Sequence, residues 1–302
     1  MSQDFATNNG MITAAFKREF HSAFEIKCQQ TQSVLQVLTN DRGQIGGASY
    51  TINDLGDMEM QAMGNRFADT VWSVPEAGTR LVTMADYGLF VPIDPRDEPK
   101  LSANPTSSYM QGCLAAEHRQ RDRVIIAAAG ASINRKTTDG ETYTPTPLPT
   151  SQVIATSATP MNKAKIAKAR ALFRKNHCDN LPLYFIYNSE ILEQILVDEE
   201  LTKWDRDTIQ QIQDGDVAKK WGGFIWLPYE DLPDAADSTE QAPAGRTFVV
   251  AKGGIHYGRN SISNFDITVR ADKSNVKQIG GIASYGAGRA NEQKVVAIDF
   301  LR

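Results

Sequence analysis

The chain has 302 residues, of which 41% are hydrophobic and 23% charged, a composition typical of a folded protein and not of a disordered one. Its formal net charge of −4 excludes the overall basic excess of most nucleic-acid-binding proteins, so a local patch would have to carry any such contact. The cysteines Cys28, Cys113 and Cys178 are widely spaced and argue against a disulfide or zinc framework. With no export signal and no apolar run of membrane length, we expect the protein to stay in the cytosol.

The first predicted element follows a polar terminus, residues 1–10. Ile12, Phe16, Phe20, Phe24 and Cys28 recur at steps of four residues, which predicts a helix with one apolar face. Three phenylalanines on one helix face require another apolar surface that covers them. The pattern is compatible with a helix packed on its own subunit and with an arm that docks on a neighbouring chain.

Residues 39–100 have short β-type segments and frequent glycines. Alternation over Arg66–Val74, followed by Arg80–Thr83 and Asp86–Ile93, predicts a long hairpin-like excursion around a turn at 75–78. The segment has few large apolar residues before Gly64, too few for a core of its own. We therefore expect it to lie on something else, either another subunit or the β-layer of its own domain.

A long helix is predicted from Pro105 to Ala129. Asn104 can cap it, Pro105 has a preset helical φ, and Gly130 ends it. At about 1.5 Å per residue it would be about 36 Å long. It is apolar at both ends and charged in the middle, over residues 117–123, so we expect it to cross a flat, extended subunit with solvent or neighbours along it.

The next predicted helix is strongly basic. It follows an exposed Thr/Pro-rich connection at 134–150, opens after Thr159-Pro160, and places Ile166, Ala169 and Phe173 on one face. It has no acidic residue. Its cations either form a solvated face or contact phosphate. They are Lys163, Lys165, Lys168, Arg170, Arg174 and Lys175.

The remainder of the chain reads as a β/α layer followed by strands. Residues 181–188 have the apolar run of a buried strand, and Ser189 caps a following helix. A strand at 224–228 follows the Gly222-Gly223 break. From residue 247 onward the sequence is strand-like throughout.

Catalytic motifs are absent from the sequence. The histidines His21, His118, His177 and His256 have no metal-binding spacing, and there is no GxSxG elbow or phosphate-binding GxxxxGK[ST] loop. The glycines at 286–288 lack the third glycine of a dinucleotide fingerprint. We therefore predict no catalytic, cofactor or metal site, and a cytosolic enzyme with a β/α core at 180–230 is disfavoured.

The order of these segments resembles that of the major capsid proteins of tailed bacteriophages with the HK97-type fold, and most of all the podovirus-like group. The resemblance rests on VTMADYGLFVPIDPRDEP, the long helix ending in DRVIIAAAGA, the basic KAKIAKARALF helix, and GDVAKKWGGFIWLPYEDLP. The last fragment is a GA-x-R-x-x-E-x-x-VV-x-I pattern formed by Gly286, Ala287, Arg289, Glu292, Val295, Val296 and Ile298. The resemblance as a whole covers residues 11–302.

The resemblance implies an α+β fold with five parts. These are an N-terminal arm at 1–38, an extended E-loop at 39–100, a peripheral domain at 101–180 with the spine helix 105–129, an axial domain at 181–258, and C-terminal strands at 259–302 that return to the peripheral domain. No long charged helical segment precedes Met11, so a fused scaffolding domain is not expected and a separate scaffolding protein is implied.

The implied function is structural: self-assembly through pentamers and hexamers into an icosahedral virion shell around double-stranded DNA, with a portal protein and decoration proteins as further partners. Inter-subunit contacts are expected from Phe16, Phe20, Phe24, Arg66, Glu76, Arg80 and Asp86. The six cations of the 163–175 helix are the candidates for facing DNA. An encapsulin-like cargo shell is the alternative within the same fold.

Overall fold

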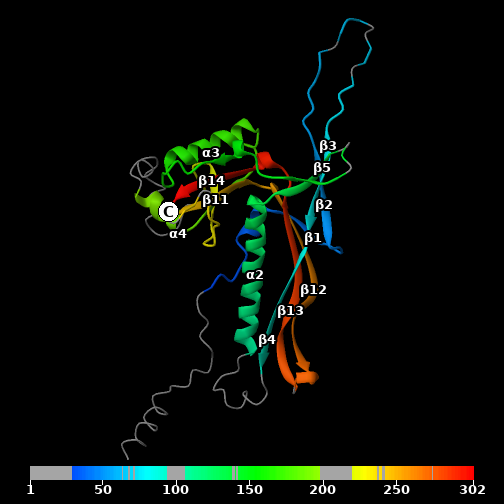
Figure 1. The fold of residues 1–302 in the computed structure, drawn as a ribbon, viewed down its shortest axis with the longest axis vertical. Helices are drawn as coiled ribbons and strands as arrows, with labels where there is room; N and C mark the ends of the chain where they lie inside the picture. The colour runs from blue at the N-terminus through cyan, green and yellow to red at the C-terminus, as the bar shows by residue number, and fades with distance from the viewer. Residues whose placement is uncertain are drawn as a thin grey trace, which may run out of the picture.

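The computed structural model describes residues 29–62, 64–66, 69–70, 72–93, 106–137, 140, 142–197, 220–236, 238–239, 242–273 and 275–302. In these residues the fold combines helices with three β-sheets. Figure 1 shows an elongated molecule with a broad upper body, a long lower limb and a hairpin that projects upward. The α-helices of the described part are α2 (Thr106–Gly130), α3 (Lys163–Lys175) and α4 (Ser189–Val197). Short 3-10 helices lie at Leu35–Leu38, Thr150–Gln152, Ala271–Lys273 and Glu292–Lys294.

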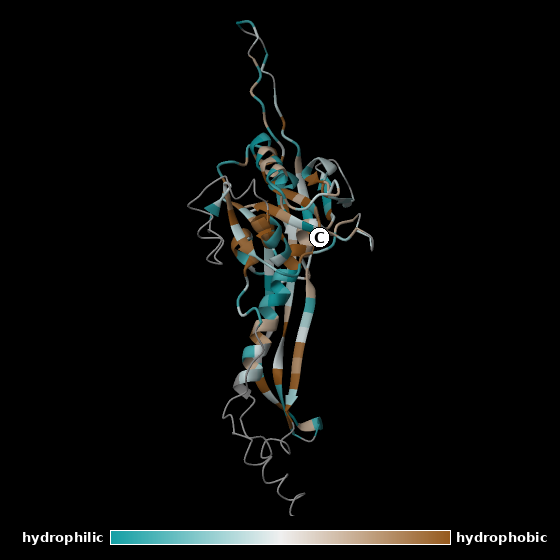
Figure 2. Ribbon diagram, turned by 90° about the vertical axis from the view of Figure 1, so that its left-hand side faces the viewer, coloured by the Kyte–Doolittle hydropathy of each residue, from teal (hydrophilic) through white to brown (hydrophobic). Residues whose placement is uncertain are grey.

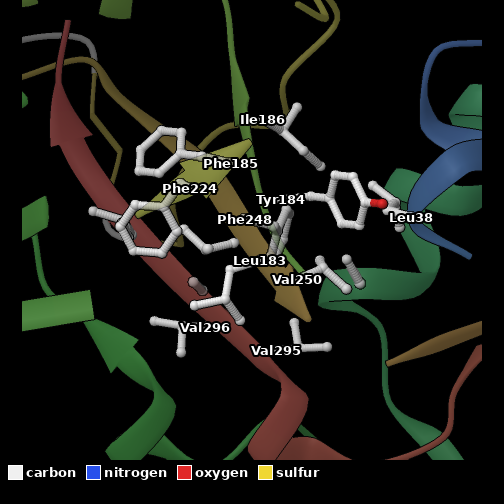
Figure 3. Packing of buried hydrophobic residues seen from close by; sticks show 14 of the residues in the cluster. Leu38, Leu183, Tyr184, Phe185, Ile186, Phe224, Phe248, Val250, Val295 and Val296 are labelled. Carbon is white, nitrogen blue, oxygen red and sulfur yellow. The ribbon is translucent and has the colours of Figure 1, made fainter. Parts of the chain in front are cut away.

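A six-stranded sheet forms the upper body. Its order is β7 (Val153–Ile154), β14 (Val295–Leu301), β11 (Ala244–Ala251), β8 (Leu183–Tyr187), β10 (Phe224–Pro228) and β9 (Lys220–Trp221). Apolar side chains from β8, β10, β11 and β14 pack on both faces of this sheet in the largest core cluster, which also includes Leu38 (Figure 3). Within it, the rings of Phe185 and Trp226 stack with centroids 4.2 Å apart. The near-continuous apolar runs predicted these buried strands because both faces of the sheet are covered.

A second, four-stranded sheet forms the lower limb, in the order β1 (Asn40–Gln44), β12 (Ile255–Arg270), β13 (Val276–Arg289) and β4 (Ala85–Ile93). The antiparallel β12–β13 pair is long, and α2 runs along one face of the sheet (Figures 1 and 2). A small core of Ile93, Cys113 and Ile279 lies between the sheet and the helix. The limb is therefore thin, with one helix on one sheet.

The third sheet forms the base of the projecting hairpin, in the order β2 (Ser49–Leu55), β3 (Ala77–Thr83), β5 (Ile133–Thr137) and β6 (Thr144–Thr146). It lies close against the long sheet because three positions there have no side chain. A Cβ at Gly258 would lie 2.9 Å from Tyr50 Cε1, one at Gly286 would lie 2.9 Å from the Thr83 carbonyl, and one at Gly288 would overlap Val82. Residues with side chains at these positions would push the hairpin base off the body.

Two expectations from the sequence need correction. The strands β3 and β4 do not form a hairpin with each other: β3 pairs with β2 and β5, while β4 pairs with β13. The described residues within 64–76 form no strand, although Arg66–Val74 alternates. The basic helix α3 packs on the six-stranded sheet, because Ile166, Ala169 and Phe173 join the main core.

The segment 39–100 contributes strands to two sheets, and β14 lies between β7 and β11 in the same sheet as β8 and β10. The long helix α2 has nearly its predicted limits. The predicted helix after Ser189 is described up to Val197, and its continuation lies outside the described residues.

Candidate inter-subunit surfaces

The projecting hairpin exposes large apolar side chains. Met60 is fully exposed, and Trp72 and Val74 are 84% and 85% exposed, with Leu55 and Met58 also mostly uncovered. They lie in and beside the excursion between β2 and β3, beyond the body in both views (Figures 1 and 2). Single exposed apolar residues are ordinary, but a cluster on a thin projection is typical of a surface that another molecule covers.

A buried charged cluster holds the base of this hairpin. The Arg80 guanidinium on β3 donates to both carboxylate oxygens of Glu292, with Nη2 2.7 Å from Oε2, and its Nε donates to Asp54 Oδ2 at 2.8 Å. Arg135 on β5 donates to the same Asp54 oxygen at 2.8 Å. Burial acts to raise the pKa of Glu292, but the hydrogen bonds and charge of Arg80 outweigh it and hold that pKa below its usual value. The cluster therefore joins the hairpin to the body through ionised groups.

The four hairpin charges predicted to contact neighbours have different surroundings. Arg80 is 4% exposed and fully engaged within its own chain, so its prediction as an inter-subunit donor is wrong. Asp86 is exposed but accepts a hydrogen bond from Ser284, and Glu76 lies 3.4 Å from Arg135. Arg66 is exposed on the excursion. The predicted Phe16, Phe20 and Phe24 lie outside the described residues.

The middle of α2 anchors the start of the described chain. The fully buried Asp122 carboxylate accepts hydrogen bonds from the Gln30 amide, from Ser33 Oγ at 2.5 Å, and from the backbone N–H groups of Val34 (2.9 Å) and Leu35 (3.2 Å). Val34 is the N-cap of the 35–38 turn but has no capping side chain, so Asp122 supplies that acceptor from a distant helix. Sequence reasoning missed this role, since it expected the charged centre of α2 to face solvent or neighbours.

A groove lies between α2 and β4, next to this anchor. Its volume is about 240 Å³, and it is lined chiefly by Tyr87, Leu89, Ala116, Arg119, Ala283 and Tyr285. At its floor the Tyr285 hydroxyl donates to Glu117 Oε1 at 2.7 Å, and Arg121 donates to the same oxygen at 2.5 Å. Burial acts to raise the pKa of Glu117, but these two hydrogen bonds outweigh it and lower that pKa. The Glu117 carboxylate at the floor is thus paired within the subunit, and side chains of β4 form the open apolar wall.

The basic helix α3 divides into buried and exposed cations. Lys165 is buried, and its Nζ donates to the carbonyls of Thr156 (2.9 Å), Thr159 (2.7 Å) and Asp299 (2.9 Å). Burial lowers the pKa of Lys165 to about 8, against the charge of Asp299. The prediction that Lys165 faces DNA is therefore wrong, because its ammonium group is enclosed. Arg170 donates to the Gly223 carbonyl at 2.7 Å.

The other α3 cations lie nearer the surface. Lys168, Arg174 and Lys175 are exposed, Arg174 lies 3.8 Å from Asp179, and Lys163 is half-buried. Across the described residues, no three His, Cys, Asp or Glu side chains gather as metal ligands, and no helix is long and apolar enough to cross a membrane.

The comparisons with known proteins agree with this architecture. A family model described as phage capsid protein matches residues 12–302. No curated protein matches the sequence. Among solved structures, the head structure of Helicobacter pylori bacteriophage KHP40 superposes with a TM-score of 0.67 at 10% identity, covering 92% of this chain and 95% of that chain. The capsid of cyanophage Pam1 superposes with a TM-score of 0.64 at 14% identity, covering 96% and 97%. A structure from Mycobacterium phage Che8 gives 0.64 at 12% identity, covering 92% and 95%. At these identities the structures establish a shared fold.

Proposed function

We propose, from the premise that this chain belongs to the phage capsid protein family, that its copies assemble as pentamers and hexamers into an icosahedral shell around double-stranded DNA. The protein is a tailed-phage major capsid protein with the HK97-like fold, and its role is structural. The observation that carries the assembly proposal is the hairpin excursion, whose exposed Met60, Trp72 and Val74 are left uncovered by the described part of their own subunit. A neighbouring copy can provide that cover.

We propose that the three sheets occupy different places in the shell. We assign the six-stranded sheet with α3 and α4 to an axial unit around the capsomer axes, and the long sheet with α2 to a peripheral unit between capsomers. The β2–β3 hairpin is the E-loop, which reaches a neighbouring copy. Several modest contacts per subunit suit a shell, because each is individually reversible and their sum is large.

The N-terminal segment would add a second reaching contact. We propose that Phe16 and Phe20, the members of the stripe farthest from the anchored residues 29–35, pack on a neighbouring copy. Phe24 is the phenylalanine of the stripe nearest to these anchored residues in the sequence. A separate scaffolding protein, a portal protein and decoration proteins are the other proposed partners, and assembly is proposed to occur in the host cytoplasm.

The exposed cations of α3 are the proposed DNA contact. With Lys165 enclosed, the group reduces to Lys168, Arg174 and Lys175, with Lys163 and Arg170 at its margin. Such contacts would be non-specific and salt-dependent, since they act on phosphate charge. Lys168→Glu with Lys175→Glu should reduce genome retention in assembled particles, and Ala167→Ser is the matched surface control. Equal DNA content in both particles would remove this role.

Electron microscopy of the purified protein, with size-exclusion chromatography, tests the main proposal. We expect capsomers or closed particles of megadalton size. A small oligomer under all conditions would contradict shell formation and would favour the enzyme alternative. Closed particles that package a protein cargo without DNA, when produced with the phage packaging proteins, would favour an encapsulin-like shell instead.

A further inference from the structure

The groove between α2 and β4 is open, partly aromatic and unoccupied by any described residue. Tyr87 and Leu89 form its β4 wall and are both more than one third exposed, while Ala116 leaves space on the helix side. We propose that this groove is the docking site for Phe24 of the same chain. The proposal concerns packing within one subunit and does not depend on shell assembly.

The path of the described chain leads to this groove. The backbone N–H groups of Leu35 and Val34 donate hydrogen bonds to Asp122. The side-chain Oε1 of Gln29 accepts a hydrogen bond from Arg119 Nη1 at 2.7 Å. Going backward from residue 35 to residue 29, the chain therefore descends α2 toward its N-terminus. Arg119 itself lines the groove, so the described chain starts at the groove's rim.

Phe24 precedes this rim by five residues. Five residues span at most about 17 Å when extended, and Gln29 already bonds Arg119 of the groove lining, so the groove lies near the start of the segment that carries Phe24. The tether also favours the intramolecular contact, because a short linker gives an effective concentration in the millimolar range. Phe24 of a second copy would have to compete with this effective concentration for the same groove.

The chemistry of the groove fits a phenylalanine flanked by an acidic residue. Tyr87 and Tyr285 offer aromatic faces, and a volume of about 240 Å³ accommodates one aromatic ring. The rim is basic, with Arg119 and Arg123, and Glu25 follows Phe24 in the sequence. Docking of the Phe24 ring would cover apolar surface of Leu89, which is more than one third exposed.

Photo-crosslinking of the unassembled subunit tests this placement. The phenylalanine analogue p-benzoylphenylalanine replaces Phe24, and an equal mixture of ¹⁵N-labelled and unlabelled subunits is irradiated and mapped by mass spectrometry. We expect crosslinks to peptides of β4 and α2 within the same chain, and the same probe at Phe5, in the polar terminus, serves as the control for non-specific labelling. Crosslinks that join labelled to unlabelled chains, or that avoid β4 and α2, would overturn the proposal.

A second measurement compares the rate of proteolysis when the groove is filled and when it is left open. Ala116→Trp fills it, so trypsin should cleave after Lys27 about tenfold faster than in the native subunit, because cleavage tracks the undocked population. Ala116→Ser leaves the groove open and should cleave at the native rate. Equal cleavage rates in both variants and the native subunit would contradict docking. The crosslinking experiment does not depend on either Ala116 variant.

Discussion

Neutralising Glu292 should loosen the base of the projecting hairpin. In Glu292→Gln, Arg80 keeps its 2.8 Å hydrogen bond to Asp54 and can keep one bond to the new amide, but it loses the bidentate charged pair. Breaking a buried ion pair costs about 3–5 kcal/mol when a charge is left alone. Asp54 still faces Arg80 and compensates part of its charge, but Arg135 shares the same carboxylate. We therefore expect a loss of about 2 kcal/mol in the free energy of unfolding.

The assay is urea denaturation of the unassembled subunit, with Glu76→Gln as the matched control. The Glu76 side chain is 62% exposed and 3.4 Å from Arg135, so its loss should cost less than about 0.5 kcal/mol. The pKa of Glu292 is lower in the folded chain than its usual 4.5, so its contribution is present above pH 4.5 and is lost as the pH falls through the folded value. Glu292→Gln should lack this part of the acid destabilisation. Equal destabilisation by the two variants at pH 7 would refute the reasoning.

Three further outcomes are expected. Asp122→Asn should cost about 2 kcal/mol and speed amide hydrogen exchange at Val34, because one amide oxygen cannot replace two carboxylate oxygens that accept four hydrogen bonds; native exchange at Val34 would argue against the anchor. The folded pKa of Lys165 is about 8 instead of 10.5, so the unfolded chain binds more protons between these values and stability should rise from pH 8 to 10.5. In Lys165→Met that rise should disappear, as denaturation at the two pH values would detect. Trp72→Asp and Phe20→Asp should each give soluble subunits that fail to assemble, and native-like particles in electron micrographs would remove the corresponding contact.

Local sequence patterns were sufficient for the elements whose signals lie within a few residues. The cap and terminating glycine of the long helix place it within about one residue of Thr106–Gly130, and the apolar run at 181–188 contains β8. Helix limits and buried strands depend on backbone propensity and on periodic burial, which short windows record. The order of these elements along the chain carried the resemblance to phage capsid proteins, which the family match confirms.

Which side chains meet was decided by the tertiary structure. Alternation could not tell that β3 pairs with β2 and β5 and not with β4, because a strand's partner is set by elements far away in the chain. Lys165, Arg80 and Asp122 are charged residues that a sequence pattern assigns to the surface. Each is buried because distant carbonyls, carboxylates or N–H groups compensate its desolvation. Local patterns were enough to predict most of the elements and their order. Three-dimensional packing decided which charges hold the subunit together, since the cost of burying a charge depends on partners that only packing supplies.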